Sequence, residues 1–174
     1  MKSNRTVGLS TITLVAATLL FAPRSFAADS PAAAVATTRR IVVSIPDRKL
    51  ALIENDRIVR VYAVAVGAEV SPSPVGTFTI VNRVSNPTYY KPGVVIGPGS
   101  TNPIGTRWIG LNAKGFGIHG TDAPASIGFA KSHGCIRLRN RDVEQLFERV
   151  RAGDIVELHA ERTPEIAQLF AEVK

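Results

Sequence analysis

The sequence predicts a mainly β domain with one or two short helices. Short runs rich in β-branched residues alternate with turn residues from position 39 onward, which is typical of a sheet built from hairpins. One segment after Asn140 has helical periodicity, and Thr163-Pro164 can open a second, shorter helix. The chain has 174 residues and a formal net charge of +7. This length suits one domain with a real core.

The first 27 residues have the features of a secretory signal peptide. A positive start is followed by an apolar run from Val7 to Ala22 without an acidic residue, and then by Ser25-Phe26-Ala27. The apolar run is shorter than the ~20 residues that a membrane span needs. We therefore expect cleavage after Ala27 and export to the periplasm or cell wall.

The rest of the chain divides by composition. Residues 28–38 are small and rich in Pro, Ala and Thr, which indicates a flexible linker. We expect one folded domain over residues 39–160 and a C-terminal helical tail over 161–174. After cleavage the net charge would be 18 − 14 = +4, without a basic run interleaved with aromatics, so nucleic-acid binding is not expected.

Several strands follow one another in the first half of the domain. Residues 41–45 and 50–53 flank a turn and predict a hairpin. Residues 58–66 are apolar on both faces, so we expect a long strand at the centre of a sheet. The proline loop at 71–76 is stiff, and residues 77–84 resume as a strand.

The second half predicts a binding loop, a hairpin and a helix. Residues 86–103 are rich in Pro, Gly and aromatics, which suits either a binding loop or a packed surface loop. Residues 108–111 and 116–119 predict a hairpin. Asn140 is expected to cap a helix that ends near Gly153.

The chemistry points to the only cysteine, Cys135, and to two of the three histidines, His119 and His133. An imidazole that takes the thiol proton produces a thiolate nucleophile. Gly134 beside the cysteine leaves room for a substrate carbonyl at backbone N–H groups, and Arg137 can seat a charged substrate. Acyl transfer through a thioester is the reaction class that fits.

Two alternatives are weighed against this hypothesis. The two histidines and one cysteine are a plausible zinc ligand set, but no paired Cys-x-x-Cys or His-Glu-x-x-His motif accompanies them. A buried inert cysteine would not explain Ser-His-Gly-Cys followed by an arginine two residues on. We therefore expect no metal and no cofactor.

The set His119-Gly120-Thr121, followed by Ser132 to Leu138, resembles the L,D-transpeptidases of bacterial cell-wall synthesis (the YkuD-type catalytic domain). Supporting matches lie at residues 71–78 and 102–108 and at Asn86-Pro87, so the resemblance covers about residues 39–160. It implies a compact β-sandwich or barrel. Where the family often has a tryptophan after Asn-Pro, this chain has Tyr89-Tyr90.

The resemblance also implies residue roles. Cys135 would attack the third residue of a peptidoglycan tetrapeptide stem, release D-alanine and pass the acyl group to an amine. His119 would be the base, steered by the carbonyl of Gly120, although the residues alone do not choose between His119 and His133. The remaining expected site residues shape the oxyanion hole, hold the loop or a carboxylate, or bind substrate: Ser132, His133, Gly134, Arg137, Tyr89, Tyr90 and Trp108.

The expected partners are peptidoglycan stem peptides, with a second stem, an envelope protein's lysine or a D-amino acid as acceptor. Carbapenem-type inhibitors are expected to acylate Cys135 because they mimic an acyl donor. Two other functions stay open. With water as acceptor the site would act as an L,D-carboxypeptidase or amidase, and without catalysis the domain would only bind the wall.

Overall fold

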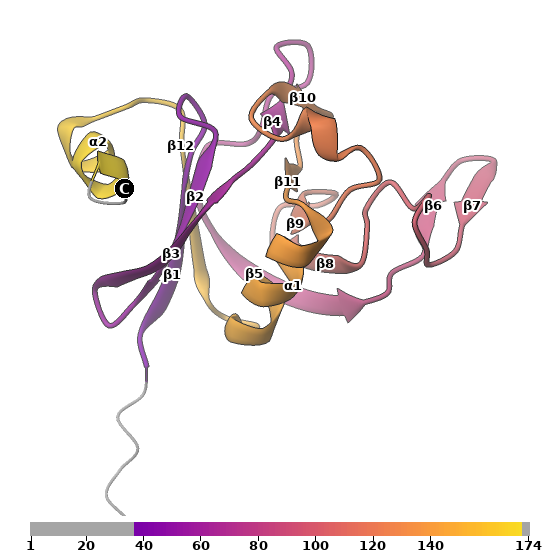
Figure 1. The fold of residues 1–174 in the computed structure, drawn as a ribbon, viewed down its shortest axis with the longest axis horizontal. Helices are drawn as coiled ribbons and strands as arrows, with labels where there is room; N and C mark the ends of the chain where they lie inside the picture. Colours follow the sequence, from indigo (N-terminus) through magenta and orange to yellow (C-terminus); the bar gives the residue numbers. More distant parts are fainter. Residues whose placement is uncertain (1–36, 172–174) are drawn as a thin grey trace, which may run out of the picture. The chain divides into compact units, whose positions relative to one another are not determined.

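The structure is a computed structural model that describes residues 37–171. The predicted signal peptide and linker residues 28–36 lie outside this range. The described fold is mainly β with two α-helices, which confirms the predicted fold class (Figure 1). Neither of these two helices is long and apolar enough to cross a membrane.

Eight strands form one mixed sheet in the order β11-β9-β8-β5-β12-β1-β2-β3. The pairs β1–β12 and β9–β11 are parallel, and the other neighbours are antiparallel. The strand bounds are β1 Arg39–Ser44, β2 Lys49–Glu54, β3 Arg57–Ala63, β5 Gly76–Ser85, β8 Arg107–Leu111, β9 Gly117–His119, β11 Ile136–Arg137 and β12 Ile155–His159. The predicted hairpins β1–β2 and β8–β9 are therefore confirmed.

Two small pairs and three helical segments complete the described chain. β4 (Val66–Gly67) pairs with β10 (Ala130–Ser132), and β6 (Tyr89–Lys91) pairs with β7 (Val94–Ile96). The helical segments are the 3₁₀ turn η1 (Pro124–Ser126), α1 (Asn140–Arg149) and α2 (Pro164–Ala171). The β6–β7 hairpin falls inside the segment that the sequence predicts only as a loop.

The prediction of one central strand over residues 58–66 is wrong. β3 ends at Ala63 and is the edge strand of the large sheet, with Val59 36% exposed. After Ala63 the chain no longer pairs with β2, and Ala65 exchanges two backbone hydrogen bonds of 2.9 Å with Arg137 of β11. β3 and β11 are the two edges of the sheet, so residue 65 links them and the sheet curls toward a barrel. The apolar run over residues 58–66 extends past the end of β3 because Val64, Ala65 and Val66 are buried where the two edges of the sheet meet.

The core lies inside the curled sheet and is covered by α1. Val143 and Leu146 of α1 are fully buried against residues such as Ile109 and Ile118 of the sheet. A second, smaller cluster lies on the other face of β1 and β2, where α2 packs through Ile166. β1 is apolar at every position from Ile41 to Val43 because each of its faces meets a helix or the core.

Asn140 does not cap α1, in contrast to the prediction. The cap position is Arg139, which makes no capping hydrogen bond through its side chain. The Oδ1 atom of Asn140 instead accepts the backbone N–H groups of Thr106 (3.3 Å) and Thr121 (3.1 Å). The helix ends at Arg149, before Gly153, whose φ of +92° belongs to the turn that leads into β12. The asparagine thus joins the helix to two loops of the sheet.

Replacement of Gly105 by alanine is expected to destabilise the fold by about 2–4 kcal/mol. Gly105 has a φ of +60°, and a Cβ there would lie 2.1 Å from Oδ1 of Asn140 and 2.6 Å from backbone atoms. Urea denaturation measures the loss. Gly153→Ala is the matched control, since it has a positive φ but open space around the added carbon. Equal losses for the two variants would contradict the close packing at Asn140.

Candidate active site

His119 is the last residue of β9 and is almost entirely buried. It pairs with Trp108 across the antiparallel β8–β9 ladder, and the two rings stack with centroids 5.6 Å apart at 19°. Its Nδ1 atom lies 2.5 Å from the carbonyl oxygen of Gly120. A carbonyl can only accept, so Nδ1 carries the proton and Nε2 has a free lone pair. The geometry therefore provides a base at Nε2.

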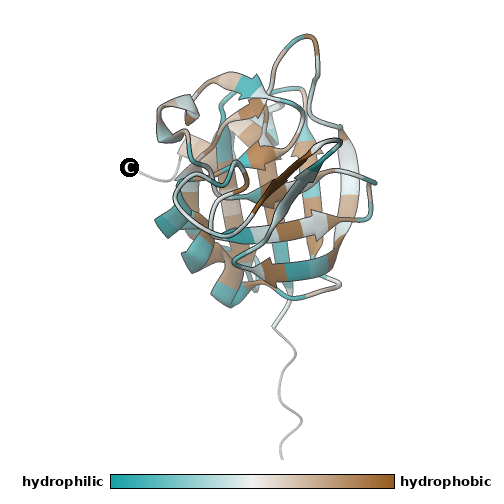
Figure 2. Cartoon of the chain, turned by 90° about the vertical axis from the view of Figure 1, so that its right-hand side faces the viewer, coloured by the Kyte–Doolittle hydropathy of each residue, from teal (hydrophilic) through white to brown (hydrophobic). Residues whose placement is uncertain are grey.

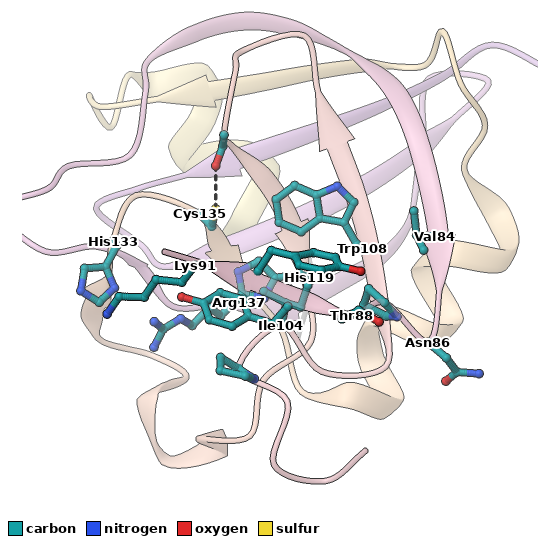
Figure 3. A pocket seen from close by; sticks show the side chains of 15 residues that line it. Val84, Asn86, Thr88, Lys91, Ile104, Trp108, His119, His133, Cys135 and Arg137 are labelled. Atoms are coloured by element: carbon teal, nitrogen blue, oxygen red, sulfur yellow. Dashed lines mark hydrogen bonds between the residues drawn. The ribbon is translucent and has the colours of Figure 1, made fainter. Parts of the chain in front are cut away.

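Cys135 immediately precedes β11, which runs parallel to β9 with Ile136 opposite Ile118 and Arg137 opposite His119. Neighbouring strands are about 4.8 Å apart, so this register brings the cysteine and His119 to one edge of the sheet. In the structure the thiol donates to the carbonyl of Gly115 at 3.6 Å, drawn as a dashed line in Figure 3. Cys135 and His119 both line one cavity.

The loop before the cysteine is held by Ser132. Its hydroxyl donates to the carbonyl of Cys135 (2.6 Å) and accepts the N–H of Gly134 (3.0 Å). Gly134 has a φ of +108°, and a Cβ there would lie 2.6 Å from the ring of Phe116. Since the Gly134 N–H is already used, the N–H of Cys135, which has no hydrogen-bond partner among the described residues, is the better candidate oxyanion donor.

The cavity has a volume of about 870 Å³ and opens beside the β6–β7 hairpin. Figure 2 shows the hydrophobic strand β7 crossing in front of the sheet. Fifteen residues line the cavity; none is acidic, and Lys91 and Arg137 are cationic. Of the expected site residues, those that line it are Tyr89, Tyr90, Trp108, His119, His133, Cys135 and Arg137. Gly120, Ser132 and Gly134 are not among the lining residues; the Gly120 carbonyl contacts His119, and the Ser132 hydroxyl contacts Gly134 and Cys135.

Within residues 37–171, no three His, Cys, Asp or Glu side chains are grouped to hold a metal ion. The third histidine, His159, instead contacts Glu157.

Comparison with known proteins decides the family. The model of the YkuD family, described as the L,D-transpeptidase catalytic domain, matches residues 38–158. The chain belongs to this family. It is a family of enzymes linked to peptidoglycan, and membership agrees with the resemblance that the motifs around His119 and Cys135 indicate.

Relatives in sequence and in structure support the assignment. The chain is 45% identical over 107 residues to a Bacillus licheniformis protein named as the L,D-transpeptidase YkuD, covering 62% of this chain and 57% of that protein. It is 37% identical over 118 residues to YqjB of Bacillus subtilis, also named as an L,D-transpeptidase, covering 65% and 66%. The chain thus spans between about half and two thirds of these relatives.

Solved structures show the same fold. An L,D-transpeptidase from Mycobacterium smegmatis superposes with a TM-score of 0.61 at 21% identity, over 71% of this chain and 59% of that one. L,D-transpeptidase 3 from Mycobacterium tuberculosis, in complex with a faropenem-derived adduct, gives 0.58 at 22% identity, over 72% and 61%.

Burial governs the protonation of this transpeptidase-type pair. Burial lowers the pKa of His119 to about 4, although the hydrogen bond to Gly120 opposes the shift. Burial raises the pKa of the Cys135 thiol, opposed by a hydrogen bond from the Gly117 backbone and by the charge of Arg137. At neutral pH the free protein therefore holds a neutral thiol and a neutral imidazole.

We expect the alkylation of Cys135 by iodoacetamide to be slow at neutral pH and to keep rising beyond pH 9, because only the thiolate reacts. A neutral-pH rate below that of glutathione is the expected result. Cys135 is the only cysteine, so every label reports on this site. A rate that is constant between about pH 5 and 8 would reveal a resting thiolate–imidazolium pair and would contradict this assignment.

Trp108 has a role that the sequence does not reveal. It is expected to bind substrate, but its ring also stacks on His119, and its Nε1–H donates to Asn82 at 3.1 Å. Gly110 and Gly117, which face each other across β8 and β9, leave the space that the indole fills, since a Cβ at either would lie within 2.8 Å of it. The tryptophan is therefore a wall of the cavity and a support for the imidazole.

Asn102 is a second residue that the sequence analysis missed as part of the site. It is fully buried, its Nδ2 donates to the carbonyl of Pro87 (2.7 Å) and to that of Gly97 (3.1 Å), and its Oδ1 accepts the N–H of Ile104 (2.9 Å). These bonds fix both ends of the β6–β7 hairpin over the cavity. An Asn-Pro pair in a long loop is the signal that such a side chain organises its own backbone.

Proposed function

We propose that this chain is an exported L,D-transpeptidase that remodels peptidoglycan through a thioester on Cys135. The observation that carries the proposal is the shared cavity of Cys135 and His119, in which the bond from Nδ1 to Gly120 leaves Nε2 as a base. Family membership supports the reaction class.

In the first step the sulfur of Cys135 attacks the carbonyl of the third stem residue while Nε2 of His119 takes the thiol proton. The oxyanion is stabilised by backbone N–H groups, of which the Cys135 N–H has no partner among the described residues. The bond to the terminal D-alanine breaks, and its nitrogen leaves with the proton from His119. The thioester then remains on Cys135.

In the second step an amine attacks the thioester and His119 takes its proton. The proton returns to sulfur when the C–S bond breaks, so the enzyme is regenerated without a metal or cofactor. Water in place of the amine would give hydrolysis. The two outcomes differ only in the acceptor that reaches the cavity.

The charge of the cavity supports an anionic donor. Lys91 comes from β6 and Arg137 from β11, and the lining contains no Asp or Glu. Stem peptides carry free carboxylates, including the one on the terminal D-alanine, and these complement the cationic lining. Inhibition by carbapenems is part of the proposal, and a related structure described as an L,D-transpeptidase in complex with imipenem supports it.

We also propose that the chain is exported. It rests on the signal-peptide features of residues 1–27, with residues 28–38 as a linker, residues 39–160 as the catalytic domain and 161–174 as the tail. Export would bring the protein to the periplasm or cell wall, where its proposed substrate, peptidoglycan, is found.

The test is product analysis of the mature protein incubated with a disaccharide-tetrapeptide, with and without an added D-amino acid. Transfer gives cross-linked dimers or D-amino-acid-exchanged stems. Tripeptide alone would mean hydrolysis, and tight binding without any product would favour a wall-binding domain.

A further inference from the structure

One peptide group connects the catalytic histidine to helix α1. The carbonyl of the Gly120–Thr121 peptide accepts the Nδ1–H of His119 at 2.5 Å, and the N–H of the same peptide donates to Oδ1 of Asn140 at 3.1 Å. A peptide group is planar, with its C=O and N–H pointing in opposite directions. A bond that holds the N–H therefore also fixes the direction in which the carbonyl faces His119.

The oxygen of Asn140 is itself held in place. Asn140 is the first residue of α1, whose Val143 and Leu146 are anchored in the core, and its Oδ1 also accepts the N–H of Thr106 at 3.3 Å. Gly105 and Gly120 pack against this oxygen so closely that a Cβ at either would lie 2.1 Å from it. Both partners of Oδ1 are N–H donors, which leaves only the oxygen of the amide able to face them.

We propose that Asn140 is a positioning residue that sets the tautomer and orientation of His119 through the Gly120–Thr121 peptide. With the carbonyl fixed, Nδ1 keeps its proton and the lone pair of Nε2 stays directed into the cavity. A hydrogen bond on the N–H also polarises the peptide, which strengthens the carbonyl as an acceptor. The catalytic consequence rests on the proposed function, in which His119 is the base.

Three variants separate positioning from stability. Asn140→Leu keeps the branched shape of the side chain but cannot accept a hydrogen bond, whereas Asn140→Asp keeps an acceptor oxygen. Asn55→Gly is the control. It removes a hydrogen bond of the same kind, in which the side chain of Asn55 accepts the backbone N–H of Thr38 at 3.2 Å. Asn55 lies in the turn between β2 and β3, at the opposite edge of the sheet from β9 and β11. Asn140→Ala replaces the leucine variant if the latter does not fold.

We expect Asn140→Leu to lower kcat by about 10- to 100-fold with little change in KM. Asn140→Asp should recover activity to within about threefold of the wild type, and Asn55→Gly should change only the melting temperature. A leucine variant with wild-type kcat, or an aspartate variant no better than leucine, would overturn the proposal.

A readout without substrate tests the same inference if transpeptidation itself is not observed. Long-range nitrogen–proton NMR spectra of the ¹⁵N-histidine-labelled protein report which ring nitrogen of His119 carries the proton. We expect the Nδ1–H form in the wild type and in Asn140→Asp, and a mixture or the Nε2–H form in Asn140→Leu. An unchanged tautomer in Asn140→Leu would overturn the proposal, whatever the substrate proves to be.

Discussion

Replacement of Cys135 by alanine is expected to abolish product formation, lowering the turnover of tetrapeptide by at least about a thousandfold. The change removes the sulfur to which the acyl group would be attached, and no other cysteine exists in the chain to replace it. Muropeptide analysis by liquid chromatography measures the loss.

The fold should survive this change, because the Cys135 side chain is only partly buried. The loop around it is held by the Ser132 hydroxyl, which bonds to main-chain atoms of Gly134 and Cys135 that the substitution does not alter. Circular dichroism and thermal melting check this point. Full activity in a folded Cys135→Ala variant would refute the thioester mechanism.

Replacement of His119 by glutamine is expected to reduce turnover by about 10²- to 10⁴-fold, since the proton of the thiol then has no acceptor of suitable basicity. His133→Gln is the matched control. His133 lines the same cavity but is exposed. It should keep most of the activity. Initial rates with one donor and one acceptor at neutral pH compare the two variants.

The reverse order of effects would make His133 the base. The sequence alone leaves that choice open, and only the resemblance to the transpeptidase family selects His119. The structure adds a physical reason, because His119 has its Nδ1 bound to Gly120 and its ring stacked on Trp108.

The sequence predicts those parts of the fold and site that depend on local patterns. The β1–β2 and β8–β9 hairpins follow from short apolar runs that flank turns, and the chemistry of Cys135 follows from its neighbours. Family resemblance then adds the steering of His119 by Gly120, a bond that the structure contains.

The features that sequence analysis misses depend on long-range register. The apolar run over residues 58–66 predicts one buried strand. The sequence does not reveal that pairing with β2 ends at Ala63 and that Ala65 pairs with β11. The sequence predicts Asn140 as a helix cap, because the side chain of an asparagine at a helix start usually accepts a backbone N–H of its own helix. Its actual partners, Thr106 and Thr121, are 34 and 19 residues away.

The central claim is the thioester on Cys135, and intact-mass spectrometry of the mature protein with a disaccharide-tetrapeptide tests it most directly. We expect a transient adduct equal to the donor minus D-alanine, absent from Cys135→Ala and slow to form in His119→Gln. A carbapenem run in parallel should give a stable adduct on the same residue. A folded, reduced protein that forms neither adduct would contradict the claim and would leave wall binding as the function to examine.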